Sequence, residues 1–329
     1  MNATLNVAIA AEFELSEKIA ETLEQSQLNI SQLNISQLSI VEIYPFNEEQ
    51  GIRFHNKSVV QLKPEEVEWS SIHYLFFAGD IQQVAHLAKA AEMGCVVIDM
   101  KGICASLQDV PVVIPGVNQE KLVDLRQRNI VSLADPQVTQ LALAIVPLMS
   151  NHEIKDIAVT SLLPASYTNG ETVSKLAGQT ARLLNGIPLD EGEQRLAFDV
   201  FPTPASHLNT QIHKIFPQLD NVVFHSIQVP VFYGMGQMVS VLSDYALDPQ
   251  SCLASWADNP LMTYHAEKYC TPVTNGEQEM AEEQVAKLHI SGLSAVENGL
   301  QFWSVADEQR FNLALLSVTL AELIYSQGY

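Results

Sequence analysis

The chain has 329 residues, of which 47% are hydrophobic and 17% charged, a composition that fits a globular protein and excludes a disordered one. Its 17 Lys and Arg oppose 38 Asp and Glu, so the net charge of −21 repels both nucleic acid and anionic lipid, and neither is expected as a partner. No apolar run reaches the roughly 20 residues of a membrane span and no secretory leader is recognised, so a cytoplasmic location is expected.

The first predicted elements are a strand, a tight turn and an amphipathic helix between Asn6 and Leu23. A dinucleotide-binding domain opens in this way, but there glycines let the backbone turn sharply and let the pyrophosphate approach the helix N-terminus. The segment "NVAIAAEFELSEKIAETL" contains no glycine. The scaffold of the motif is therefore predicted without the residues that bind phosphate.

Further strands are predicted along the N-terminal third of the chain, with helical patterns such as residues 81–94 between several of them. The predicted strands, in chain order, are residues 5–11, 38–46, 73–79, 95–100 and 109–117. Alternation of this kind predicts a Rossmann-type, doubly wound parallel sheet. Between the first helix and the second strand, Ser26–Ile40 repeats a five-residue unit three times, and we expect a lengthened surface loop or a strand extension there.

After Pro147 the apolar runs are widely spaced, which is typical of an α+β domain with a mixed or antiparallel sheet. The runs cover residues 154–166, 194–202, 221–234 and 238–247. Residues 306–327 predict a single amphipathic helix with Asp307 near its positive end. The acidic run 275–284 is interpreted as a solvated helix face, with a docking patch for a cation or a basic protein as the alternative.

The cysteines and histidines do not match a recognised metal motif. Cys95, Cys104, Cys252 and Cys270 form no CxxC pair and have no histidine at zinc-finger spacing, so we expect neither a metal site nor disulfides, only buried thiols. His207, His213 and His225 are candidates for a second metal site, but their spacing matches no ligand motif, and they are interpreted as surface or core residues.

Several segments resemble the aspartate-semialdehyde dehydrogenase family. Within Phe76–Asn118, "VID" and "DVPVVIPGVN" are similar to the family's "VID" and "DVPLVVPEVN", and "IQVPVFYGMGQ" is similar to "VRVPVFRGHSE". "LADPQVTQLALAIVPL" is similar to the nucleophile segment "ANPNCSTIQMVVALKPL". The resemblance implies a Rossmann-type domain of residues 1–128 with 307–329 and a dimerisation domain of residues 129–306. It also implies a homodimer that carries out NADP-dependent interconversion of aspartyl phosphate and aspartate semialdehyde.

The resemblance also places the family's catalytic groups on this chain. The nucleophilic Cys falls on Val138, the catalytic His on Met235, the substrate-binding Arg on Gln228 and the Gln that positions the acyl group on Leu163. Valine has no nucleophilic atom, a thioether is no base near neutral pH, and an uncharged amide lacks the bidentate fork of a guanidinium. Thr139, beside Val138, is expected to cap a helix and not to act as a nucleophile.

The cofactor positions differ from the family in the same way. The family's glycine loop falls on residues 10–16, including Ala10, Phe13 and Ser16, while its phosphate-binding Arg falls on Ala105 and its terminal-helix motif reaches Glu308. The phenylalanine side chain in this loop blocks the approach of a pyrophosphate to the backbone, and the two glutamates repel its negative charge. No cofactor is therefore expected, although the family uses NADP.

These differences favour a catalytically inactive paralogue that serves as a binding or interaction protein, as a homodimer or as a heterodimer with an active relative. The alternative is an NADP-dependent oxidoreductase of the family with altered chemistry or substrate, acting on an aldehyde or acyl phosphate. Apolar closure around Val138, Leu163, Met235 and Phe13 would favour the first interpretation, and an open polar pocket would favour the second.

Overall fold

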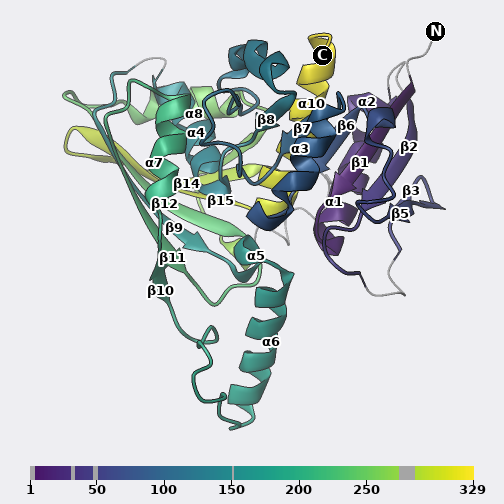
Figure 1. Ribbon diagram of the computed structural model, residues 1–329. Coiled ribbons are helices and arrows are strands. Elements are labelled where there is room, and N and C mark those ends of the chain that lie inside the picture. Colours follow the sequence, from purple (N-terminus) through teal and green to yellow (C-terminus); the bar gives the residue numbers. More distant parts are fainter. Residues whose placement is uncertain (1–3, 31–33, 47–50, 150–151, 274–285) are drawn as a thin grey trace. The chain divides into compact units, whose positions relative to one another are not determined.

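The computed structural model describes residues 4–30, 34–46, 51–149, 152–273 and 286–329, and the acidic run 275–284 lies outside them. The chain forms two compact units (Figure 1): unit 1 consists of Met1–Thr139 with Asn312–Tyr329, and unit 2 of Gln140–Phe311. In the part of the chain that the structure describes, no helix combines the length and the apolarity needed to cross a bilayer.

Unit 1 contains a six-stranded sheet in the order β5-β2-β1-β6-β7-β8, and every neighbouring pair is parallel. Its strands are β1 (Thr4–Ala10), β2 (Asn34–Val41), β5 (Val60–Leu62), β6 (Tyr74–Phe77), β7 (Val96–Asp99) and β8 (Ile130–Ser132). Its other elements are α1 (Phe13–Gln25), α2 (Gln27–Ile30), the hairpin of β3 (Arg53–Phe54) and β4 (Lys57–Ser58), η1 (Trp69–Ser71), η2 (Ile81–Gln83), α3 (Val84–Glu92), η3 (Gln119–Gln127) and α10 (Leu316–Ser326).

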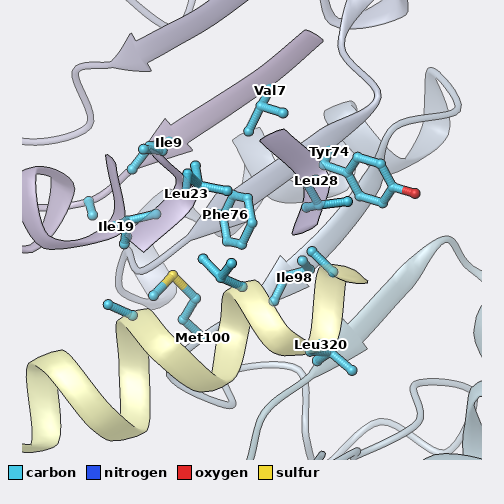
Figure 2. Close-up of a cluster of buried hydrophobic side chains, with 14 of the residues drawn as sticks. Val7, Ile9, Ile19, Leu23, Leu28, Tyr74, Phe76, Ile98, Met100 and Leu320 are labelled. Carbon is cyan, nitrogen blue, oxygen red and sulfur yellow. The ribbon is translucent and has the colours of Figure 1, made fainter. Parts of the chain in front are cut away.

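Both faces of this sheet are covered because successive side chains of β1 point to opposite sides. Val7 and Ile9 pack with α1 and α10 in one core cluster, which Figure 2 shows. Ala8 and Ala10 belong to the cluster that α3 covers on the other face. Helices on both faces of a parallel sheet give the doubly wound arrangement that the sequence predicts.

Unit 2 contains a seven-stranded mixed sheet in the order β10-β11-β9-β12-β15-β14-β13. Its strands are β9 (Asp156–Leu163), β10 (Phe201–Thr203), β11 (Asn221–Gln228), β12 (Met235–Leu242), β13 (Met262–His265), β14 (Leu288–Val296) and β15 (Gly299–Ala306). Its helices are α5 (Ala165–Thr168), α6 (Gly170–Leu184), α7 (Ser206–Ile215) and α8 (Pro249–Ala257). The helix α4 (Pro136–Met149) and the π-helical segment η4 (Glu308–Leu315) contain the boundaries between the units.

One face of the unit 2 sheet carries the core. Trp256 of α8 is fully buried, stacks edge-on against Phe302 of β15 with ring centroids 5.2 Å apart, and donates to the carbonyl of Ala144 in α4 at 2.9 Å. A buried indole that finds an acceptor joins apolar packing to a satisfied hydrogen bond. With this mixed sheet in the second unit, the predicted fold class is confirmed.

Two predicted surface or strand segments differ in the structure. The repeat Ser26–Ile40 contributes α2 and β2, with Leu28 and Ile40 almost completely buried, so the strand alternative holds and the surface-loop alternative is wrong. Residues 109–117 make only an isolated bridge between Val112 and Ser132 and no strand. Prolines remove two backbone donors from this segment, and the Asn118 amide takes over by accepting from Ile114 N and donating to Val112 O, each at 2.8 Å.

The other two differences lie in the C-terminal half. Residues 194–200 form no strand, because the Gln179 side chain accepts from the backbone N–H groups of Leu196 and Ala197 and so replaces a strand partner. The single terminal helix expected over residues 306–327 is a π-helical segment followed by α10. The carboxylate of Asp307, which the sequence places only near the positive end of the helix, caps it by accepting from Gln309 N at 3.0 Å and Arg310 N at 2.9 Å.

Candidate functional site

The edge of unit 1 where its parallel strands end is the place where such sheets bind ligands. β1 pairs with β2 on one side and β6 on the other, so the connections leave its end in opposite directions. Ala10 ends β1 and is buried, Glu12 follows at the N-cap position of α1, and Phe13 is the first helical residue. The sequence motifs place the degenerate cofactor loop at this edge, and the local elements agree with that position.

Side chains occupy this turn. The Phe13 ring packs edge-on against Phe46 with centroids 5.5 Å apart. Ser16 is fully buried and donates its hydroxyl to the Ala11 carbonyl at 3.4 Å, while its backbone N–H bonds to Glu12 O at 2.9 Å. The first turn of α1 is thus packed against its own chain, with an aromatic pair beside it.

The same edge carries negative charge. Tyr44 donates to the Asp80 carboxylate at 2.6 Å, and Lys101 lies 3.9 Å from that carboxylate. The pKa of Tyr44 is raised by burial, then by the hydrogen bond and charge of Asp80, and then by Glu12. Two carboxylates that act on one phenol produce a field that opposes a pyrophosphate.

Gly79 follows the end of β6 by two residues, and the packing around it explains why this residue is a glycine. A Cβ there would lie 2.6 Å from the Phe77 ring and 2.9 Å from Ile43 Cδ1, so a side chain cannot be accommodated without movement. Close packing of this edge therefore explains the glycine without a phosphate ligand.

Ala105 lies in a closed turn that follows β7. Its N–H bonds to Gly102 O at 3.1 Å, and only 1% of the residue is exposed. The turn is organised by the buried Asp99 carboxylate, which accepts from Ser132 Oγ and Cys104 N, each at 2.7 Å. Burial raises the pKa of Asp99, and these hydrogen bonds act in the opposite direction. An alanine here supplies no charge for a phosphate.

Val138, at the family's nucleophile position, lies in the first turn of α4 and is fully buried. The helix is capped by Asp135, whose carboxylate accepts from Gln137 N at 2.8 Å. Thr139 instead donates its hydroxyl to Ala134 O at 3.0 Å, so the expected Thr139 cap is wrong. An aspartate that directly precedes a helix-starting proline is the sequence signal that identifies the cap.

In unit 2, three family positions lie together at one end of adjacent strands. Leu163 and Gln228 are register partners at the ends of β9 and β11, and Met235 begins β12. Their exposed fractions are 2%, 6% and 0%. The Gln228 amide donates to Leu163 O at 3.1 Å, so it satisfies a neighbouring carbonyl within the fold. The structure brings these three predicted positions together, and they form a closed, mostly apolar group.

Glu308 lies beside this group and is 1% exposed. One carboxylate oxygen accepts from Ser166 Oγ in a short hydrogen bond, and the other accepts from Gly234 N at 2.9 Å. Burial raises the pKa of Glu308 to about 7, Asp307 adds to this, and the two donors act against it. The family motif assigned Glu308 to the cofactor positions and gave no sign of Ser166, whose partner is 142 residues away.

Five of the nine histidines bear on a possible metal site, and they form two groups. His207, His213 and His225 are exposed, which fits their interpretation as surface residues. The ligand atoms of His265, Cys270 and His289 lie within 4.8 Å of one another. Sequence spacing did not single out this second group, because its members come from two strands and the loop that follows one of them.

Comparison with known proteins adds the following. No family model matches the chain. It is 63% identical over 329 residues to the USG-1 protein homolog of Haemophilus influenzae, with 100% of both chains covered. It is 30% identical over 269 residues to the aspartate-semialdehyde dehydrogenase of Vibrio mimicus, covering 77% of this chain and 83% of that one. The crystal structure of aspartate semialdehyde dehydrogenase II complexed with ASA from Vibrio cholerae has a TM-score of 0.86 at 26% identity, covering 99% and 100% of the two chains.

The order of the strands, the positions of the quoted motifs and these relatives agree. The chain belongs to the aspartate-semialdehyde dehydrogenase family.

Proposed function

We propose that this family member does not run the thiol-dependent dehydrogenase reaction and serves as a binding or interaction protein. The chemistry of the family's catalytic positions carries this proposal. Val138, Leu163 and Met235 offer no nucleophile, amide or base, and each is at most 2% exposed. Loss of a nucleophile or its base alone costs several orders of magnitude in rate.

The edge of unit 1 supports the same proposal for the cofactor. Phe13 and Phe46 pack where the family's loop would admit a pyrophosphate, and the carboxylates of Glu12 and Asp80 act on this region. NADP carries several negative charges of its own. We therefore propose that NADP and NAD do not bind at concentrations where the family uses them.

Calorimetric titration of the full chain with NADP and NAD up to millimolar concentration tests this point. The Vibrio mimicus relative serves as the positive control in the same buffer. No heat of binding to this chain is the expected result. Micromolar binding would overturn the proposal, and NADPH formation from aspartate semialdehyde, NADP and inorganic phosphate would do so as well.

We also propose that the protein is a homodimer that uses the face of the unit 2 sheet that the described residues leave exposed. On this face Met238 and Thr160 are register neighbours, and Met238, Val223 and Leu242 are 37%, 51% and 39% exposed. A groove of about 630 Å³ lies beside β11 and α7, and its lining includes Val223 and Asn209. Sheet faces pack against a second layer, and a second copy of the chain offers the same partly apolar face.

Analytical ultracentrifugation of the Met238→Glu variant tests the dimer, because a buried charge at this position weakens a sheet-to-sheet contact. The matched control is Val123→Glu, which changes a valine that is 70% exposed in η3 of unit 1. We expect Met238→Glu to be monomeric and Val123→Glu to remain dimeric. Unchanged association of both variants would contradict the proposal.

Co-expression with an active relative tests whether a mixed dimer forms. Recovery of pure homodimers alone would exclude a mixed dimer.

One observation favours the alternative of altered chemistry. Glu308 is a buried carboxyl with a pKa raised to about 7, and Gly234, the residue next to Met235, donates to it. A buried carboxyl group whose pKa lies near neutral pH is suited to act as a general base. If turnover of an aldehyde or acyl phosphate is detected, Glu308→Gln should abolish it under this alternative. Glu193→Gln, which changes a glutamate distant in the sequence, is the control and should leave the turnover unchanged.

A further inference from the structure

The His265, Cys270 and His289 group lies in the outer strands of the unit 2 sheet. His265 ends β13, Cys270 follows it by five residues, and His289 is the second residue of β14. β13 and β14 are parallel, with His265 opposite Ser291. Because residues two apart on a strand share a face, His289 and Ser291 point to the same side as His265.

The three ligand atoms converge in a mostly buried place. His265 Nε2 lies 2.9 Å from His289 Nδ1, and the ligand atoms of all three residues lie within 4.8 Å of one another. Cys270 is fully buried, His289 is 6% exposed, and His265 is intermediate. One imidazole therefore reaches solvent and provides a route by which an ion can enter.

These separations are close to those of a tetrahedral metal site. Zinc–nitrogen bonds of about 2.0–2.1 Å and zinc–sulfur bonds of about 2.3 Å place ligand atoms about 3.3–3.6 Å apart. The two imidazole nitrogens, 2.9 Å apart, lie slightly inside that spacing, and the sulfur, within 4.8 Å of them, would have to move by at most about 1.2 Å.

The surrounding residues hold the Cys270 loop against β14. Trp303 Nε1 donates to the carbonyl of Cys270 at 2.7 Å. Gly292 has φ +62°, and a Cβ there would lie 2.3 Å from the ring of Tyr269, so the residue before Cys270 packs directly on a bare backbone position of β14. Outer contacts of this kind orient the groups that ligate a metal.

The polar groups near these three residues fit a metal site in which one coordination position is open to water. The Ser291 hydroxyl is buried and has no hydrogen-bond partner among the described residues, and it can bond to a water on a bound ion. Burial raises the pKa of the Cys270 thiol, and the charge of Lys268 acts in the opposite direction.

We propose that His265, Cys270 and His289 bind one Zn²⁺ ion. One thiolate and two imidazoles form a donor set suited to zinc, and three protein ligands leave the fourth position to a water or an exogenous ligand. As the metal–sulfur bond forms, the Cys270 thiol releases its proton to solvent. The site uses none of the family's catalytic positions, so it is independent of the function proposed above.

The test starts from the full chain freed of metal by a chelator and titrated with Co²⁺, whose visible spectrum reports its ligands. Wild-type protein is expected to bind one ion per chain and to show ligand-field bands together with a thiolate-to-cobalt charge-transfer band. Zn²⁺ should displace the cobalt stoichiometrically. Absence of these bands at excess Co²⁺ would overturn the proposal and leave the group as a hydrogen-bonded imidazole pair beside a thiol.

Variants locate the ion. Cys270→Ser should abolish the charge-transfer band and weaken Zn²⁺ binding by more than about 100-fold, since outer contacts alone are worth 10- to 100-fold. Cys252→Ser, which changes a buried thiol in α8, is the matched control and should change neither property. His265→Gln removes the more exposed ligand and gives a second reading if Cys270→Ser fails to fold. Retention of the charge-transfer band in Cys270→Ser would contradict the proposal.

Discussion

The two units close the ends of their central strands in different ways. In unit 1, Phe13 and Tyr44 are only partly buried and contact Phe46 and Asp80 at the margin of the sheet. In unit 2, the corresponding family positions are almost completely buried, and the Glu308 carboxylate bonds to groups of its own fold. Phe13 and Tyr44 reach solvent and can be trimmed at the first edge, although Ser16 and Ala105 beside them are buried, whereas the family positions of unit 2 all lie in its core.

The comparison predicts its largest effect at Glu308. Replacement by Ala leaves the Ser166 hydroxyl and the Gly234 N–H without their acceptor in a buried place, and it opens a cavity. We expect the free energy of unfolding to fall by about 2–4 kcal/mol. Urea unfolding followed by the fluorescence of Trp256 and Trp303, both in unit 2, measures it.

Glu308→Gln is the control, because its amide oxygen retains one acceptor and it should lose less stability than Glu308→Ala. A loss below about 0.5 kcal/mol for the alanine variant, the size of an ordinary surface change, would mean that this end of unit 2 is not part of the core.

Acidity should alter the same region in a defined direction. The folded-state pKa of Glu308 is raised from 4.5 to about 7, so the folded state holds this proton more tightly than the unfolded state. Its contribution to stability is therefore complete below pH 4.5 and is lost as the pH rises through 7. We expect about 1–3 kcal/mol less stability at pH 8 than at pH 5 from this group.

Glu308→Gln isolates the effect, since burial also raises the pKa of Asp99 and of Glu322 and these groups act in the same direction. The difference in stability between wild type and variant, measured from pH 5 to 8 by urea unfolding, should change with pH. A constant difference would refute the assignment to Glu308.

The aromatic pair of unit 1 should give a smaller effect. A double-mutant cycle of Phe13→Ala and Phe46→Ala isolates the edge-to-face contact, for which we expect a coupling of about 1 kcal/mol. Urea unfolding followed by the fluorescence of Trp69 in unit 1 measures each variant. Additive effects of the two exchanges would show that the rings do not stabilise each other and that the edge is open.

The sequence predicts the fold because its signals are local and mutually consistent. The apolar run from Val7 to Ala10 identifies a strand that is buried on both faces, and Asp307 marks the start of the terminal helical segment. Periodicity fails at residues 109–117, where the side chain of Asn118 satisfies the backbone that a neighbouring strand would otherwise satisfy.

The site is predictable only to the extent that family motifs mark it. Gln228 and Met235 lie in the quoted motif "IQVPVFYGMGQ", and the structure brings them together with Leu163. Ser166 with Glu308, and His265 with His289, meet only through the sheet register or across more than a hundred residues. Neither spacing nor composition carries this information, because contact between distant residues is decided by the fold.

The smallest effect is expected at Tyr44. Tyr44→Phe removes the hydroxyl that donates to Asp80 at 2.6 Å, but both groups reach solvent, so water replaces the bond and the free energy of unfolding should fall by less than about 1 kcal/mol. Urea unfolding measures the change, with Tyr245→Phe, which alters a tyrosine that is 78% exposed, as the matched control. A loss as large as that of Glu308→Ala would contradict the comparison, because the edge of unit 1 would then contribute as much to stability as the interior of unit 2. A small loss means that Phe13 and Glu12 can next be replaced by glycine in a folded protein, so that the contribution of these two side chains to excluding NADP can be measured directly.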